Sequence, residues 1–228
     1  MWYLFIVAAS YILLICYDIA CLYGKKSLSY VFALLGIGLQ CISTGYGVYL
    51  SLSDLSLEVY FNHAFEKSIS CIGVICSFGL LVYCLFFALP AKDTYISNDN
   101  QSNNNQLKLV NTGFYALCRH PGVWFLSLFY LFLGIVFEHS IIFYLWIANT
   151  VGDVIYVLIQ DIYIFQKTIC DYHSYQTETP FLIPTKKSIL KMMNHKKPHL
   201  LKDDAHPSKE DRTPIIENEI EVRDNDFI

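Results

Sequence analysis

The chain has 228 residues, of which 54% are hydrophobic and 16% are charged, and its mean hydropathy is +0.39. Soluble domains usually carry about a quarter charged residues, so this composition excludes an ordinary soluble globular protein. The eight cysteines contain no C-x-x-C pair. They do not form the closed ligand cluster of a metal site, so we predict no metal and expect the thiols to pack as small apolar groups. We expect no nucleic-acid partner.

The apolar residues gather in long runs at residues 2–23, 29–50, 69–89, 122–137 and 140–164. A helix needs roughly 20 apolar residues to cross the hydrocarbon layer of a bilayer. The fourth run is short, but it can begin near His120. The first run lacks the basic start and cleavage site of a signal peptide. The sequence therefore predicts an all-α, polytopic membrane protein with about five transmembrane helices.

The basic residues indicate how these helices are oriented. With the N-terminus outside, Lys67 is the one basic residue in the outer segments, and the other fifteen of the sixteen Lys and Arg lie inside. This distribution agrees with the positive-inside rule. We expect an N-terminus outside and a cytoplasmic C-terminus.

The chain divides into four predicted parts. Residues 1–89 hold three transmembrane helices, and 90–112 form a flexible cytosolic loop with the Asn-rich stretch "ISNDNQSNNNQ". Residues 113–185 hold the last helical hairpin and the segment after it. The cytosolic tail, 186–228, is first basic and then acidic, and we expect it to be disordered. Its basic amphipathic start, "KKSILKMMNHKK", is also a candidate to lie on an anionic leaflet.

Polar residues inside the predicted helices mark candidate functional positions, because such residues cost free energy in a membrane. Asn149, Asp153, Tyr156 and Gln160 fall within about 60° of one another on one helix face. The stripe ends at Asp161. It is consistent with interhelical hydrogen bonds, but we favour a water-filled cavity.

Two further segments flank this hairpin. Before it, "NTGFYALCRHPGVW" places Arg119 and His120 at a helix start with Pro121 in the first turn, where free N–H groups favour an anion. Taken alone, this pair is also consistent with a simple interfacial charge anchor. After the hairpin, "DYHSYQTETPFLIP" places Tyr172 and Tyr175 about one turn apart, which by itself is typical of an aromatic belt.

Together, these segments resemble the membrane methyltransferase superfamily that includes isoprenylcysteine carboxyl methyltransferases and phospholipid N-methyltransferases. Members carry G-x-Y-x-x-x-R-H-P before a helical hairpin. After the hairpin come two adjacent glutamates, then Y-x-x-Y, then a short segment ending in proline. The matching residues here are Gly113, Tyr115, Arg119, His120, Pro121, Tyr172, Tyr175, Pro180 and Pro184. The resemblance covers residues 90–185.

The resemblance implies a cytosol-facing pocket for S-adenosylmethionine and a lipidic or isoprenoid-linked acceptor, a carboxylate or an amine, that enters from the bilayer. The catalytic residues would be Arg119, His120 and Asp161. The residues expected to contact the cofactor are Tyr115, His120, Asn149, Asp153, Gln160, Asp161, Tyr172 and Tyr175.

The chain departs from the family pattern where Gln160-Asp161 replaces the glutamate pair. Two alternatives therefore stand beside the methyltransferase. The first is a non-catalytic membrane protein that keeps the fold for binding or scaffolding. The second is a membrane reductase, because sterol-reductase-like enzymes share a similar hairpin and R-H-P-like signature.

Overall fold

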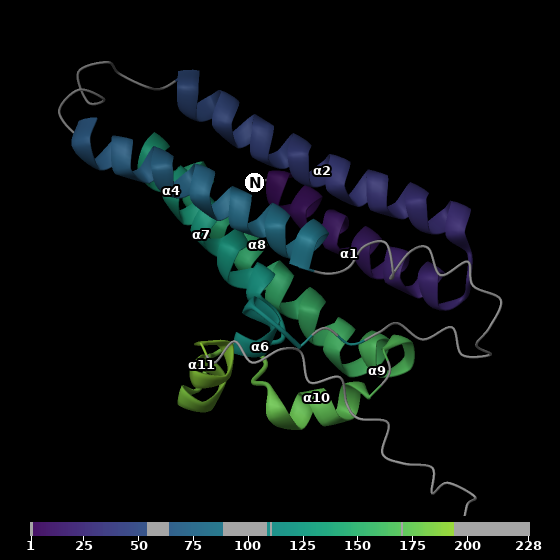
Figure 1. Cartoon of the computed structure of the whole chain (residues 1–228). Coiled ribbons are helices and arrows are strands. Elements are labelled where there is room, and N and C mark those ends of the chain that lie inside the picture. The colour runs from purple at the N-terminus through teal and green to yellow at the C-terminus, as the bar shows by residue number, and fades with distance from the viewer. Residues whose placement is uncertain (1, 54–63, 89–108, 110, 170, 194–228) are drawn as a thin grey trace, which may run out of the picture. The chain divides into compact units, whose positions relative to one another are not determined.

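The computed structural model describes residues 2–53, 64–88, 109, 111–169 and 171–193. Within these ranges every regular element is a helix and no strand occurs, which confirms the predicted all-α class (Figure 1). Most of the predicted loop at 90–112, and residues 194–228 of the predicted tail, lie outside the described residues.

Four stretches of helix are long and apolar enough to cross a membrane. They are Trp2–Leu22, Lys26–Ser53, Ala64–Leu85 and Ser140–Thr168. The first two are helices α1 and α2, and the third comprises α4 (Ala64–Val82) and the first part of the π-helical segment η1 (Tyr83–Ala88). The fourth begins with α8 (Ser140–Ile159). Helix α7 (Pro121–Phe137) is also apolar, but its 17 residues are fewer than in these four.

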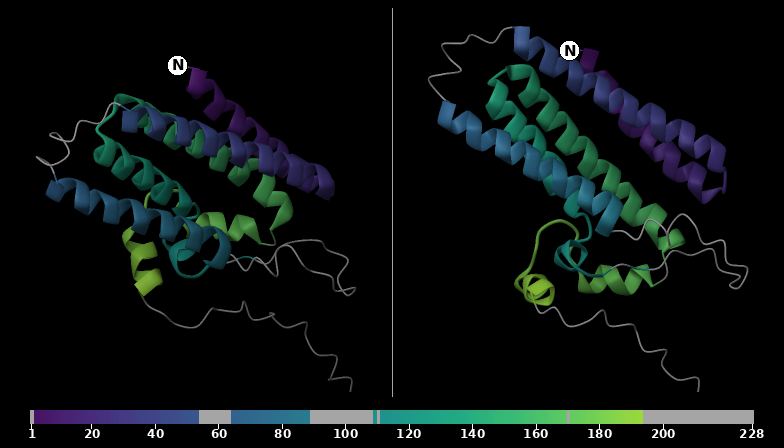
Figure 2. Two further views of the ribbon diagram at one scale, coloured as in Figure 1. Left: turned by 90° about the horizontal axis from the view of Figure 1, so that it is seen from above. Right: turned by 45° about the horizontal axis from the view of Figure 1, so that its top comes forward.

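The helices lie side by side in the order α2, α1, α8, α7, α4 (Figures 1 and 2). Helix α2 also touches α8 and α7. The core lies where α1, α7 and α8 meet. Its buried members are Tyr3, Val7, Tyr11, Tyr130, Leu133, Ile141, Ile142 and Leu145. The last hairpin is therefore packed on both sides, against α4 and against α1.

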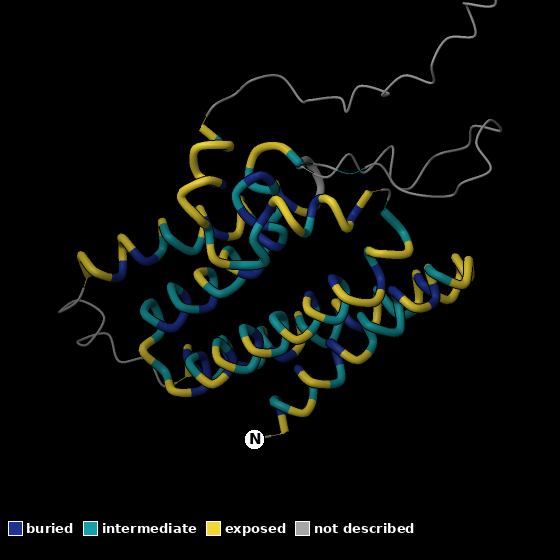
Figure 3. Tube along the Cα trace, turned by 90° about the horizontal axis from the view of Figure 1, so that it is seen from below, coloured by how far each residue is buried: buried dark blue, intermediate teal, exposed yellow. Residues whose placement is uncertain are grey.

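Helices α2 and α4 bury only small or polar residues, α1 also buries some, and all three helices expose large apolar ones. Buried positions include Ser10, Gly36, Ser43, Gly47, Ser51 and Ser77. Phe5, Leu34 and Ile75 are 77%, 74% and 72% exposed, and exposed segments run along the outside of the bundle (Figure 3). Small residues allow close helix approach, while apolar side chains on the outside suit lipid. This burial pattern is the reverse of a soluble bundle and agrees with the membrane class.

A two-residue turn joins α7 to α8. Glu138 adopts a left-handed conformation with φ 51°, and its N–H donates to the Gly134 carbonyl. His139 accepts from the Ile141 N–H and thereby caps α8. The Lys67 ammonium of α4 lies 3.5 Å from the Glu138 carboxylate, so this ion pair ties the turn to α4.

Short helices gather around the opposite end of the hairpin, near the start of α7 (Figure 1). Helix α6 (Phe114–Leu117) precedes α7, and α8 continues through the π-helical turn η2 (Gln160–Ile164) into α9 (Phe165–Thr168). Helix α10 (Tyr172–Glu178) follows, and α11 (Lys186–Met193) comes last. The first eight residues of the predicted disordered tail thus form a helix. The Thr185 side chain accepts from the Ser188 N–H, and the Ser188 side chain accepts from the Thr185 N–H. This pair of hydrogen bonds stabilises the first turn of α11.

Close packing of α4 on α7 depends on Gly73, because an added Cβ there would meet Phe132 ring atoms at 2.7 Å. We predict that Gly73→Ala destabilises the protein by about 1–3 kcal/mol through overpacking. Gly79→Ala is the matched control on the same helix, since nothing lies within 4 Å of its added Cβ. Thermal unfolding in detergent should give a lower Tm for the Gly73 variant alone; equal Tm values would contradict this packing.

Candidate functional site

One or more side chains from each of the three predicted polar segments meet at the carboxylate of Asp161. This residue lies in the π-helical turn η2 and is 5% exposed. Its Oδ1 accepts a hydrogen bond from the Tyr172 hydroxyl and lies 3.2 Å from His120 Nε2. Its Oδ2 accepts from Gln176 Nε2 at 3.0 Å and lies 3.3 Å from Arg119 Nη2. We call these five residues the Asp161 cluster.

The backbone before α7 brings Arg119 and His120 to this position. Cys118 is extended and His120 is the N-cap of α7. The Arg119 N–H donates to the Pro180 carbonyl at 3.0 Å, and the His120 N–H donates to the Phe181 carbonyl at 3.3 Å. Since Pro121 has no N–H, the chain leaves this pairing and enters α7 directly. The exit segment after α10 is thereby joined to the R-H-P start.

Helix α10 supplies the other two members of the cluster. It begins after Asp171, which adopts a left-handed conformation with φ 54°. Tyr172 and Gln176 are four residues apart and so share one face. Burial and the hydrogen bond to Asp161 raise the pKa of Tyr172, so its phenol stays protonated and acts as a donor.

Tyr175 and Tyr115 link the cluster to the end of the third long helix. The Tyr175 hydroxyl donates to the Tyr115 carbonyl at 2.6 Å, and the Tyr115 hydroxyl donates to the Cys84 carbonyl in η1 at 3.2 Å. Tyr172 and Tyr175 also contact each other, with ring centroids 5.8 Å apart. The Y-x-x-Y pair therefore bonds in two directions, toward Asp161 and toward α6.

Aromatic rings cover the basic residues of the cluster. The His120 ring stacks on Phe165 and meets the edge of Phe181, and the Arg119 guanidinium lies 5.6 Å from the Phe181 ring centre. Burial lowers the pKa of His120, although the bond to Asp161 opposes that shift. His120 is therefore neutral at pH 7, with Asp161 in place to orient its ring.

Two polar atoms near the cluster are buried without a hydrogen-bond partner within the described part of the chain. They are Arg119 Nε and Thr179 Oγ1. Buried polar atoms are nearly always hydrogen-bonded in native proteins. Each of these two atoms therefore has hydrogen-bonding capacity that the described residues leave unused.

The polar stripe predicted at Asn149, Asp153, Tyr156 and Gln160 faces the N-terminal helices. Asn149 is fully buried, its side-chain oxygen accepts from Gln40, and its carbonyl accepts from the Tyr11 hydroxyl. Gln160 donates to the Asp18 carboxylate and to the Tyr156 hydroxyl, both at 2.9 Å. Asn149 and Gln160 thus make interhelical hydrogen bonds, which is the alternative that the sequence left open beside a water-filled cavity. Asp153 lies between them on the same face, partly buried.

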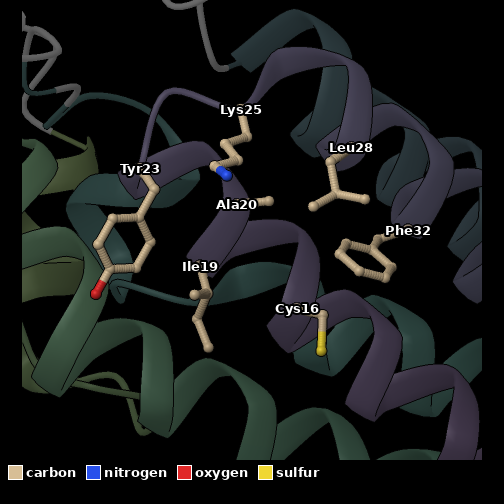
Figure 4. Close-up of a pocket in the computed structure, with 7 residues that line it drawn as sticks. All are labelled: Cys16, Ile19, Ala20, Tyr23, Lys25, Leu28 and Phe32. Carbon is tan, nitrogen blue, oxygen red and sulfur yellow. The ribbon is translucent and has the colours of Figure 1, made fainter.

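Two apolar grooves lie along α1 and are lined by none of the Asp161 cluster. One, of about 270 Å³, is bounded by residues of α1, of α2 and of the turn between them, with Lys25 as its charged member (Figure 4). The other, of about 430 Å³, lies between α1 and α8 and includes Tyr11 and Tyr156.

The structure therefore brings together Arg119, His120, Asp161 and Tyr172, with Tyr175 and Tyr115 adjacent. It places Asn149, Asp153 and Gln160 on a different side of α8. Sequence reasoning missed Gln176, whose signal was its spacing of four from Tyr172, and the covering rings of Phe165 and Phe181. No group of three or more potential metal ligands occurs among the described residues. No protein-family model matches the sequence, and comparisons with curated proteins and with solved structures give no significant match.

Replacing Asp161 by Asn tests the cluster as a structural unit. The substitution leaves the guanidinium of Arg119, whose side chain is 11% exposed, without its carboxylate. Removing one partner of a buried pair costs about 3–5 kcal/mol, so we expect a large drop in Tm in detergent. The matched control is Asp171→Asn at an exposed left-handed position that Asn tolerates. Equal Tm values for the two variants would contradict the assigned pairing.

The lowered pKa of His120 predicts a pH effect on stability. In the unfolded chain, His120 takes up a proton below its ordinary pKa of 6.5, while the folded state resists protonation. Its contribution to stability is present above pH 6.5 and is lost as pH falls toward the folded pKa. His120→Asn should therefore reduce the fall in Tm between about pH 7 and pH 5. Exposed His173→Asn is the control; identical pH profiles for wild type and His120→Asn would refute the effect.

Proposed function

We propose that this chain crosses a membrane five times, with its N-terminus outside and its C-terminus in the cytoplasm. The distribution of Lys and Arg supports this orientation. Helix α7 would be the span added to the four long helices, and it would be the fourth of the five in chain order. Its 17 residues rise about 25 Å, and a short span is accommodated by local thinning of the bilayer. The Asp161 cluster would then lie at the cytosolic ends of the hairpin helices.

The function proposed for this site is S-adenosylmethionine-dependent methyl transfer to a lipidic or isoprenoid-linked acceptor. One observation carries the proposal: the R-H-P start, Asp161 and the Y-x-x-Y segment meet around one buried carboxylate. These are the segments whose order in the sequence resembles the membrane methyltransferases. Interfacial anchors and an aromatic belt, the simpler interpretations, do not require the three segments to meet.

The side chains present fit the charged end of the cofactor. Arg119 Nε is a buried donor without a partner, which suits the amino-acid carboxylate. The rings of Tyr172, Tyr175 and Phe181 suit the sulfonium and adenine. When bound, S-adenosylmethionine would supply an electrophilic methyl group. The chain's own part would be to orient the acceptor and to exclude water.

The acceptor determines what else the cluster must do. A carboxylate acceptor already carries the attacking lone pair and needs no general base. An amine acceptor must lose a proton, and neutral His120, oriented by Asp161, is the candidate to take it. Methyl transfer would then join the amine nitrogen to the methyl carbon as the bond from carbon to sulfur breaks.

A non-catalytic membrane scaffold is the second candidate, and a specific observation favours it. Both carboxylate oxygens of Asp161 are already engaged by side chains of the protein, and Gln160 bonds to Asp18. A cofactor hydroxyl or amino group would have to displace one of these donors. In this alternative, the cluster joins the exit segment to the hairpin and does no chemistry.

Calorimetric titration of the purified full-length protein with S-adenosylmethionine and, separately, NADPH distinguishes the candidates. We expect saturable binding of S-adenosylmethionine alone. Tyr172→Phe should weaken that binding roughly tenfold, because one hydrogen bond that positions the Asp161 carboxylate is lost. Tyr163→Phe, on an exposed tyrosine of the same hairpin, should leave the affinity unchanged.

Each other result has its own meaning. Binding of NADPH alone would indicate a reductase, and binding of neither compound would indicate the scaffold. Equal affinities for the Tyr172 and Tyr163 variants would place the cofactor site away from the Asp161 cluster.

A further inference from the structure

Helix α11 presents an exposed face that combines apolar and basic side chains. Ile189, Leu190 and Met193 are 40%, 60% and 69% exposed. With Lys186, they fall within about 100° of one another on the helix, roughly opposite buried Ser188. Lys187 borders this arc and is also exposed. We call these five residues the α11 face.

The opposite side of α11 is fixed to the rest of the protein. The helix packs against α6, and Ser188 is 1% exposed. Lys191 donates to Glu178 at the end of α10 at 2.9 Å. That pair is exposed, and such pairs contribute little to stability. The orientation of α11 therefore follows chiefly from its packing, which leaves the α11 face pointing outward.

The segment that leads into α11 bonds to a tryptophan at the start of α7. The Trp124 indole N–H donates to the Leu182 carbonyl at 2.9 Å, and Trp124 is 47% exposed. Tryptophan is enriched at the boundary between membrane and water. Ile183, which follows Leu182, is 75% exposed. In the proposed topology, these exposed side chains would lie at the level of the membrane surface.

We infer that α11 docks on the cytosolic leaflet and recognises anionic phospholipid. Ile189, Leu190 and Met193 would enter the boundary between headgroups and acyl chains, while Lys186 and Lys187 pair with headgroup phosphates or carboxylates. Charge complementarity selects the leaflet as the occupant, since the apolar patch is flanked by lysines and α11 follows closely on a span of the same chain. This inference rests on the proposed orientation in the membrane, but it does not depend on cofactor binding.

Docking would also act on the candidate site. The exit segment that carries α11 pairs with Arg119 and His120 through the carbonyls of Pro180 and Phe181. Glu178, the partner of Lys191, belongs to the same short helix as Tyr172 and Tyr175. An anionic surface that holds α11 would thus hold the segment that completes the Asp161 cluster.

Lysine acylation followed by mass spectrometry tests the docking on the full-length protein in nanodiscs. Lys186 and Lys187 should react about fivefold more slowly in phosphatidylcholine with phosphatidylserine than in phosphatidylcholine alone, as expected for one docked lysine. The double variant Leu190→Ser/Met193→Ser keeps every charge and should lose this protection. Its Tm, compared with that of wild type, verifies that the fold persists.

Two results would overturn the inference. Equal reaction rates in the two kinds of nanodisc would exclude recognition of anionic lipid and leave a protein partner as the occupant of the α11 face. Protection that persists in the double variant would show only the general surface potential, without insertion of the apolar side chains.

Discussion

The arrangement of the C-terminal half depends on one constraint: the Asp161 carboxylate is buried at the end of the hairpin formed by α7 and α8. A buried carboxylate is tolerated only when it is paired and hydrogen-bonded. Its donors come from the segment before α7 and from α10, so one set precedes the hairpin in the sequence and the other follows it. Satisfying this one group therefore fixes the R-H-P start, the tyrosine helix and the exit segment relative to α8. The same contacts create the surroundings that the proposed methyl transfer would use.

Gln160, the residue before Asp161, joins the hairpin to the N-terminal helices. Gln160 and Asp161 are adjacent, yet Gln160 bonds to Asp18 in α1 while Asp161 bonds to the segments around α7 and α10. Closer to the start of α8, Gln40 of α2 and Tyr11 of α1 bond to Asn149. The long helix formed by α8 and η2 is thus polar on two sides, one for helix association and one for the candidate site. Gln160 and Asp161 thus have separate structural tasks.

Much of this could be predicted from the sequence, for identifiable reasons. Long apolar runs predicted the helices closely because crossing or burying a helix demands them. The meeting of Arg119, His120, Asp161 and Tyr172 was anticipated only through the resemblance to the membrane methyltransferases. The partners of Asn149 and Gln160 were not, because periodicity shows which residues share a face but not which helix packs there. The turn at Gln160–Ile164 also departs from a 3.6-residue repeat, since Phe165 bonds back to Gln160.

The pairing of Arg119 with Asp161 also has a consequence for biogenesis. Arg119 precedes Asp161 by a whole hairpin, so the ribosome delivers the guanidinium well before its counterion. An unpaired guanidinium remains in water, because desolvating it alone is costly. In the proposed topology, Arg119 would therefore stay outside the hydrocarbon layer during insertion and hold the start of α7 there. It would leave water only after α8 has emerged, which would make closure of this cluster a late step in assembly.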